Sequence, residues 1–149
     1  MGKNPIMDEL DERIIEEIDA GEIRYTALAR RLHMPISTVH NRIKKMEKDK
    51  IIEGYKGQIN WKKAGLGLSA YILINIDVGL LKKIGKTQDT LLKELLGIAY
   101  VKEGCIITGE ADLIVKIVSK DSMQLKDIIL DDIGSIQGII KTKTMIVLG

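Results

Sequence analysis

The sequence predicts an α+β protein of two parts, with three helices in the first and the element order βαββαβ in the second. Apolar residues recur at helical spacing between residues 8 and 50. From residue 68 onward, short runs rich in Ile and Val alternate with two helical patterns. A chain of 149 residues with 45% hydrophobic residues can form two small cores. We therefore expect two domains, residues 1–60 and residues 61–149.

The first helix is expected to begin at Asp8, a good N-cap, and to end at Gly21. A second helix follows over residues 25–32. His33 and Met34 then break the pattern.

Pro35 opens a third helix, because a proline at the first helical position sacrifices no hydrogen bond. Its expected buried stripe is Val39, Ile43 and Met46. Two short helices joined by so tight a break predict a helix-turn-helix. Residues 51–60 contain two glycines and apolar residues at period-2 spacing, which indicates either a short hairpin, making the domain winged, or an extended arm.

Charge is segregated along the N-terminal domain. Residues 24–50 carry eight basic and two acidic residues, whereas residues 8–22 carry eight acidic residues and one arginine. A polyanion is attracted to the first segment and repelled by the second, so the pattern predicts an orientation on double-stranded DNA. The alternative is two solvated helices with unlike surfaces.

In a helix-turn-helix, the first turns of the second helix of the motif meet base edges, and later basic residues meet phosphates. The candidates for base contacts are Ser37, Thr38, His40 and Asn41, and those for phosphate contacts are Lys44, Lys45 and Lys48. Arg42 has two equal alternatives, a contact with guanine or an ion pair with an acidic residue such as Asp11. His40 is equally plausible as a simple exposed helix residue.

The second domain is expected to contain four strands and two helices. The strands are residues 69–77, 100–107, 113–118 and 139–147, and the helices are residues 87–96 and 122–132. This order gives a ferredoxin-like antiparallel sheet with both helices on one face. The first strand has apolar residues on both of its faces, so the open face also needs cover, and a second copy of the chain would provide it.

Several classes of function are disfavoured. One cysteine and two histidines are too few for a disulfide or a transition-metal site, so we expect no metal or cofactor. No apolar window is long enough to span a bilayer, and none resembles a signal peptide, which favours the cytoplasm and no membrane partner. No nucleophile–base pair, paired-acid motif or phosphate loop indicates an enzyme.

Five motifs in order resemble the Lrp/AsnC, or feast/famine, family of transcriptional regulators. They are MDELDERII, LARRL, STVHNRIKKMEKDKIIEGY, TGEADLIVKI and GIIKTKTMIVL, between Met7 and Gly149. The resemblance implies a DNA-binding N-terminal domain, a hinge strand, and a C-terminal domain that dimerises and often assembles dimers into octamers. It also implies a small effector, typically an amino acid, bound where dimers meet.

On this resemblance, the effector-binding candidates lie in one loop and on the last strand. They are Thr108, Gly109, Glu110, Ala111, Asp112, Thr142 and Thr144. Gly109 lets backbone N–H groups approach a carboxylate, and Asp112 could take an ammonium group. The alternative is a simple tight turn in which Asp112 caps backbone groups.

The chain departs from the family pattern at two places. His33 and Pro35 stand where the family usually has a glycine and a capping serine. Residues 135–138, Ser-Ile-Gln-Gly, replace a Leu-Pro-Gly-Val turn, which affects the expected oligomer interface. The leading hypothesis is a ligand-responsive regulator that binds a pseudo-palindromic site, and the alternative is an architectural DNA-packing protein that needs no effector.

Overall fold

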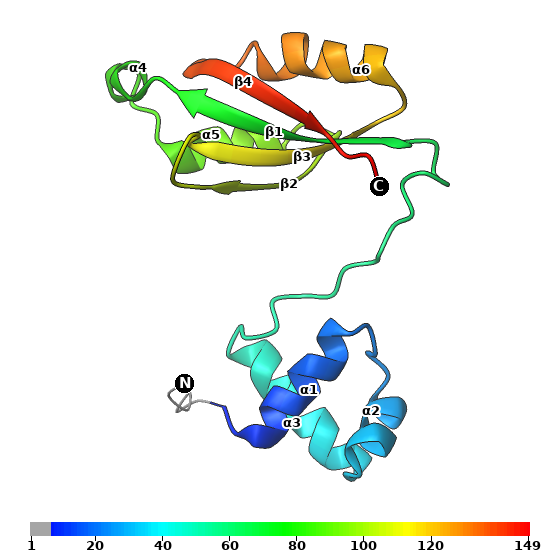
Figure 1. Cartoon of the computed structure of the whole chain (residues 1–149). Coiled ribbons are helices and arrows are strands. Elements are labelled where there is room, and N and C mark those ends of the chain that lie inside the picture. Colours follow the sequence, from blue (N-terminus) through cyan, green and yellow to red (C-terminus); the bar gives the residue numbers. More distant parts are fainter. Residues whose placement is uncertain (1–6) are drawn as a thin grey trace. The chain divides into compact units, whose positions relative to one another are not determined.

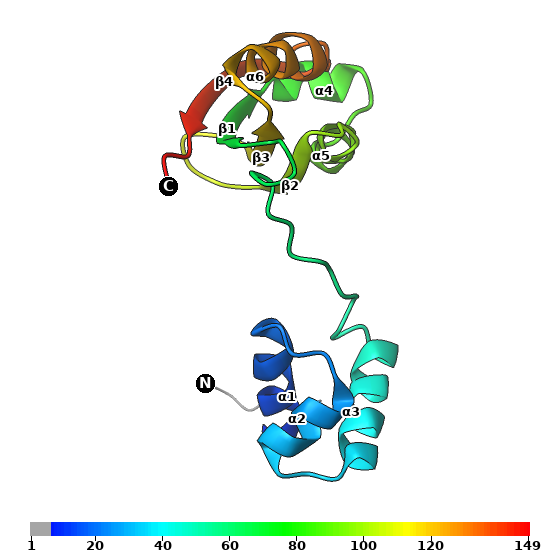
Figure 2. The same ribbon diagram turned by 90° about the vertical axis from the view of Figure 1, so that its right-hand side faces the viewer.

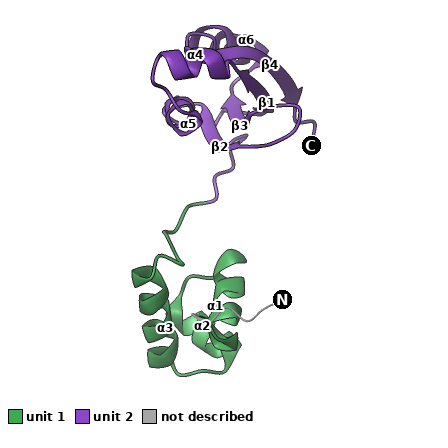
Figure 3. Cartoon of the chain, turned by 90° about the vertical axis from the view of Figure 1, so that its left-hand side faces the viewer, with its two compact units in different colours: residues 1–57 green, residues 58–149 purple. Residues whose placement is uncertain are grey.

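The computed structural model describes residues 7–149. The chain divides after Gly57 into two compact units, residues 1–57 and 58–149 (Figures 1 and 3). Each unit has a hydrophobic core of its own.

The first unit contains the three predicted helices, α1 (Glu9–Asp19), α2 (Tyr25–Leu32) and α3 (Ile36–Lys48). The side chain of Asp8 accepts a hydrogen bond from the backbone N–H of Asp11, and the Asp11 side chain accepts one from the N–H of Asp8. This reciprocal cap satisfies two N–H groups that have no partner within the helix. The core joins all three helices and is formed by Ile14, Leu28, Ala29, Leu32, Val39, Ile43 and Met46.

The connection between α2 and α3 is three residues long. His33 occupies the left-handed region, with a φ of 53°. The N–H of Met34 returns to the carbonyl of Ala29, which closes the end of α2. Pro35, with a φ of −59°, is the N-cap of α3, one residue before the first helical position at which it was expected. The predicted helix-turn-helix is confirmed.

Residues 51–67 contain no strand, so this segment is the extended arm and not a hairpin. Within the first unit, the Tyr55 hydroxyl donates a hydrogen bond to Oε1 of Glu47 over 3.1 Å. Within the second unit, the Trp61 ring lies 4.5 Å from the Lys102 ammonium, a cation–π contact.

The second unit is a four-stranded antiparallel sheet in the order β2-β3-β1-β4. Its strands are β1 (Leu68–Ile76), β2 (Val101–Ile106), β3 (Leu113–Ser119) and β4 (Ile139–Ile146). Helix α5 (Gln88–Leu96) joins β1 to β2, and α6 (Ser122–Asp127) continues into a π-helix, η1 (Ile128–Ile133), before β4. The ferredoxin-like βαββαβ order is confirmed, with a short additional helix, α4 (Val78–Lys83), after β1.

The helices gather on one face of this sheet (Figure 2). The side chains of β1 and β3 that point to this face are fully or almost fully buried, as are those of the helices that meet them. They include Ile72 and Val115, which are partners across the strand pair. Alternation along the strands therefore places the core between the sheet and its helices.

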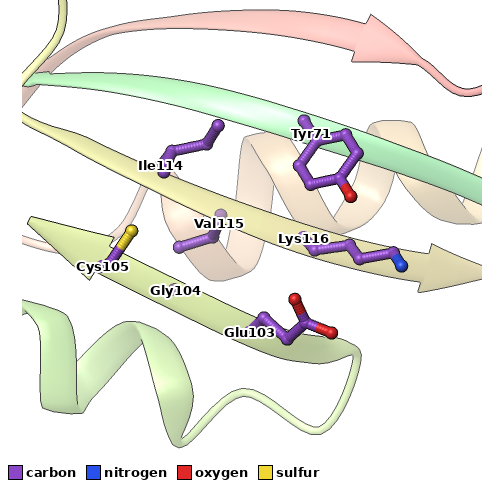
Figure 4. A pocket seen from close by; sticks show the side chains of 7 residues that line it. All are labelled: Tyr71, Glu103, Gly104, Cys105, Ile114, Val115 and Lys116. Atoms are coloured by element: carbon purple, nitrogen blue, oxygen red, sulfur yellow. The ribbon is translucent and has the colours of Figure 1, made fainter. Parts of the chain in front are cut away.

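The opposite face of the sheet carries apolar side chains that the chain itself leaves partly exposed. Tyr71 and Ile114 are half-buried and Cys105 is exposed, and all three line a shallow groove (Figure 4). Glu103 and Lys116, partners across β2 and β3, border the same groove. The Lys116 ammonium lies 5.7 Å from the centre of the Tyr71 ring.

Candidate nucleic-acid interface and ligand loop

Helix α3 has one buried side and one polar side. Val39, Ile43 and Met46 are at most 2% exposed and fix the helix against α1 and α2. The side chains exposed along the opposite side are Ser37, Asn41, Lys44, Lys45 and Lys48. Hydrogen-bonding groups thus occupy the first half of this side, and ammonium groups the second half.

Thr38 and His40 lie at the borders of the exposed side and are half-buried. The His40 ring meets the Tyr25 ring edge-on, with their centroids 5.1 Å apart and an interplanar angle of 83°. His40 is therefore packed against α2 and is not a simple exposed helix residue. Tyr25, which was not predicted as a site residue from the sequence, packs against the His40 ring and fixes its position.

Arg42 turns back toward the start of α1. Its Nη1 contacts Oδ2 of Asp8 and lies 3.3 Å from Oδ1 of the buried Asp11. The hydrogen bond from Arg42 lowers the pKa of Asp8, and the hydrogen bond to Asp8 raises the pKa of Arg42. Of the two alternatives for Arg42, the structure contains the ion pair, so a contact with guanine would require this pair to break.

The C-terminal half of α3 is bordered by a carboxylate. Glu47 accepts the Tyr55 hydrogen bond and lies 3.6 Å from the Lys44 ammonium. Partial desolvation of the hydroxyl, followed by this hydrogen bond, raises the pKa of Tyr55 to about 12. Among the described residues, Lys45 and Lys48 have no carboxylate within ion-pair distance.

Two arginines at α2 form ion pairs with carboxylates of α1 and of the connection between α1 and α2. Glu22, 8% exposed, receives hydrogen bonds from the Arg24 guanidinium at 2.9 Å and 3.0 Å. Arg31 bonds Glu17 at 2.7 Å and lies 3.6 Å from Glu22. The hydrogen bonds from Arg24 lower the pKa of Glu22 to about 2. Among the described lysines and arginines of α2 and α3, those without an ion pair are therefore Arg30, Lys45 and Lys48.

The loop of residues 108–112 is fastened to the end of β1. Oδ2 of Asp112 accepts a hydrogen bond from the N–H of Ile76 over 2.9 Å, and the N–H of Asp112 donates to the carbonyl of Ile74. The Asn75 amide donates to the carbonyl of Glu110 over 2.9 Å. Gly109 adopts a φ of 113°, which strongly favours glycine. These hydrogen bonds are the ones expected for the tight-turn alternative. Asn75 was not predicted as a site residue from the sequence.

Thr142 and Thr144 lie on β4, on the other side of β1. Their partners across the strand pair are Ile74 and Ile72. The loop also bonds to Ile74, so the fold brings the loop and Thr142 to the two sides of one position on β1. Thr108, Gly109, Glu110 and Thr144 are exposed, Asp112 and Thr142 are half-buried, and Ala111 is buried.

Two further features bear on function. Within residues 7–149, no group of three or more His, Cys, Asp or Glu side chains is placed to hold a metal ion. No described helix is long and apolar enough to cross a membrane.

Comparison with known families matches both units. The model of winged helix-turn-helix DNA-binding domains matches residues 7–53, and that of Lrp/AsnC ligand-binding domains matches residues 69–149. The chain belongs to the Lrp/AsnC family. It is therefore a transcriptional regulator with a DNA-binding helix-turn-helix and a ligand-binding domain of the Lrp type.

Similar proteins include an HTH-type transcriptional regulator of Pyrococcus abyssi, 36% identical over 95% of this chain and 92% of the relative. The HTH-type transcriptional regulator FL11 of Pyrococcus furiosus is 33% identical over 96% of this chain and 90% of FL11.

Solved structures that share the fold include the following two. Escherichia coli AsnC superimposes with a TM-score of 0.76 at 25% identity, covering 96% of this chain and 93% of AsnC. A transcriptional regulator of Neisseria meningitidis, solved as a complex with L-methionine, gives a TM-score of 0.80 at 20% identity, covering 96% of this chain and 90% of the other.

Proposed function

We propose that this regulator binds a pseudo-palindromic DNA site as a homodimer, inserting α3 of each copy into the major groove, and that an amino acid or similar small ligand changes its DNA affinity. The observation that carries the proposal is the exposed side of α3, where Ser37 and Asn41 precede Lys44, Lys45 and Lys48. Polar groups near the helix start suit base edges, and later ammonium groups suit phosphates.

Each residue on or beside this side then has a role. Ser37, Thr38, His40 and Asn41 form the base-reading set, in which the amide of Asn41 suits adenine. Lys44, Lys45 and Lys48 neutralise phosphates. Arg42 holds α3 at its angle to α1 through Asp8 and Asp11, and we assign it this positioning role in place of base reading.

The open face of the sheet supports homodimerisation. Tyr71, Leu73 and Ile114 are half-buried on this face, and a second copy of the same sheet would remove them from water. With two copies of α3 on one side of the DNA, the half-sites lie about 34 Å, one helical turn, apart, or a multiple of it. Assembly of dimers into octamers follows the family resemblance.

The ligand site that we propose comprises residues 108–112 with Thr142 and Thr144. The exposed backbone at Gly109 provides hydrogen-bonding groups in the same loop as the carboxylate of Asp112, and Thr142 and Thr144 provide hydroxyl groups on β4, on the other side of β1. The Neisseria meningitidis regulator binds L-methionine in its solved complex, which supports an amino acid as the ligand class. One oxygen of Asp112 already accepts the Ile76 N–H, which leaves the other oxygen for an ammonium group.

Selection from randomised DNA duplexes tests this function. The full chain is incubated with the pool at physiological salt, with and without the twenty amino acids, and bound duplexes are sequenced after several rounds. We expect a palindrome whose occupancy changes when amino acids are present. Tight, salt-sensitive binding without an enriched sequence would instead favour the architectural DNA-packing protein.

Two variants then distinguish a residue that contributes affinity for any DNA from a residue that contributes sequence specificity. Lys45→Ala should weaken binding to all duplexes alike and reduce the slope of log affinity against log salt by about 1. Asn41→Ala should relax the preference at one position of each half-site, at a cost of roughly 1–3 kcal/mol. The matched control is Lys93→Ala on α5, an exposed lysine of the other unit, which should leave both properties unchanged.

A further inference from the structure

The first residue of α3, Ile36, is an isoleucine that the core does not use. Its side chain is 51% exposed, whereas Val39, Ile43 and Met46 of the same helix are 0–2% exposed. The hydrophobic core of the first unit therefore excludes most of the Ile36 side chain. Elsewhere, the exposed side chains of α3 are polar or charged.

Ile36 lies at the surface, where the turn of the helix-turn-helix meets α3. It follows Pro35 directly and borders a shallow hollow between α2 and α3, together with residues of the turn. The other residues that line this hollow are Thr26, Ala29, Arg30, His33, Met34 and Pro35. Residues four apart share one face of a helix, so Ile36 lies one turn before His40 of the base-reading set.

We expect the partner of this apolar side chain on DNA, because Ile36 lies at the start of the helix proposed to enter the major groove, and the residues that line the hollow include the basic Arg30 and no carboxylate. The major-groove edges of the bases offer one apolar group, the C5-methyl of thymine. Residues in the first turn of this helix are those that reach base edges in a helix-turn-helix. A phosphate or a sugar hydrogen-bond acceptor gives an isoleucine nothing to bind.

We propose that Ile36 is a specificity-determining residue that contacts the methyl group of one thymine in each half-site. This inference rests on the proposed function and adds a hydrophobic readout to the hydrogen bonds of Ser37 and Asn41. Removing one methyl group from such a contact should weaken binding about fourfold, the value for one buried CH₂ group. Hydrogen bonding to the base is unaffected by this removal, since uracil and thymine present the same O4 acceptor.

The test uses the duplex selected with the wild-type protein. Each thymine is replaced in turn by deoxyuridine, and the dissociation constant of the full wild-type chain is measured for each duplex. We expect one thymine per half-site at which loss of the methyl group weakens binding about fourfold. This scan needs no protein variant, so a folding defect cannot imitate the result.

Ile36→Ala then connects the methyl group to the side chain. The variant should bind the thymine and deoxyuridine duplexes about equally, because a double-mutant cycle then finds no remaining coupling between residue 36 and the methyl group. The matched control is Ile23→Ala, which shortens another exposed isoleucine (57%) outside α3 and should keep the wild-type difference.

The outcomes separate this inference from the function on which it rests. A selected palindrome that is insensitive to every thymine methyl group would overturn the role of Ile36 and leave the regulator intact. A sensitivity that persists in Ile36→Ala would do the same. If no sequence is selected at all, the proposed sequence-specific function fails and the inference fails with it.

Discussion

His33 ends α2 in a conformation that few side chains adopt readily. Its φ of 53° and ψ of 43° place it in the left-handed region, where a side chain with a Cβ atom costs about 1 kcal/mol relative to glycine. His33→Gly should therefore raise the free energy of unfolding by about 0.5–1 kcal/mol. Urea unfolding followed by circular dichroism measures the change.

The control for this substitution is His33→Ala, which removes the imidazole and keeps the Cβ atom. It should leave stability close to that of the wild type. Equal gains from alanine and glycine would show that the imidazole, and not the backbone conformation, carries the cost.

Gly138 combines a left-handed conformation with a crowded site. Its φ is 104°, and a Cβ atom there would meet the side chains of Leu81 and Leu91 in the core. Gly138→Ala should lower the free energy of unfolding by about 2–4 kcal/mol, from backbone strain together with overpacking. Gly109→Ala is the matched control, because Gly109 has a similar φ of 113° and nothing within 4 Å of the added carbon.

The difference between these two variants in thermal unfolding isolates the packing contribution. Gly109→Ala should cost about 1–2 kcal/mol from strain alone. Equal losses at the two positions would mean that Leu81 moves aside without cost.

At the scale of elements, Glu22 connects the end of α1 to α2 by bonding Arg24 and Arg31. Its pKa in the folded protein is about 2, below the ordinary value of 4.5. A lowered pKa means that the group's contribution to stability is complete above about pH 4.5 and is lost as the pH falls through about 2.

Glu22→Gln removes this titration. Its melting temperature should be lower than that of the wild type at neutral pH, and the two should converge between about pH 4.5 and about pH 2. The control is Glu16→Gln, which alters an exposed carboxylate of α1 and should run parallel to the wild type. A constant gap between Glu22→Gln and the wild type down to pH 2 would exclude the ion pairs as its cause.

Helices α1, α2 and α3 could be predicted because their boundaries carry local signals. Asp8 caps α1, Pro35 precedes α3, and the apolar stripe of each helix has the helical period. Helix α4 has six residues and contains Gly79, too short a segment for a period to show. Apolar residues at 125, 128, 129 and 133 fit both an α-helix and the observed change to a π-helix after Asp127.

The residues of the candidate site also form two groups, those that local sequence signals identify and those that only the folded structure identifies. The exposed side of α3 follows from local periodicity, so Ser37, Asn41 and Lys45 could be named from the sequence. Arg42 could not be assigned, because its partner Asp11 lies 31 residues away and only the packing of α3 on α1 brings them together. Likewise, Asn75 bonds to Glu110 in the loop of residues 108–112, 35 residues away in the sequence.

At the scale of the whole molecule, the proposed dimerisation through the open face of the sheet would connect this face to DNA binding. Leu73 lies half-buried at the middle of β1, between partners Ile114 on β3 and Lys143 on β4. If a second sheet covers this face, Leu73→Glu places a carboxylate in a surface that is removed from water, and the loss of its hydration is unfavourable even with Lys143 as a neighbour. The variant should sediment as a monomer. Met123→Glu on α6, which is 76% exposed, should remain a dimer.

The monomer should also lose affinity for the palindrome while keeping its affinity for one half-site. When two binding units are joined, the second binds at a high effective concentration, which strengthens binding by on the order of 10²–10⁴. Titrating Leu73→Glu and Met123→Glu against full-site and half-site duplexes measures this difference. A Leu73→Glu variant that stays dimeric and binds the palindrome normally would mean that the copies meet through another surface, and the apolar groove of Tyr71, Cys105 and Ile114 would then need a different occupant.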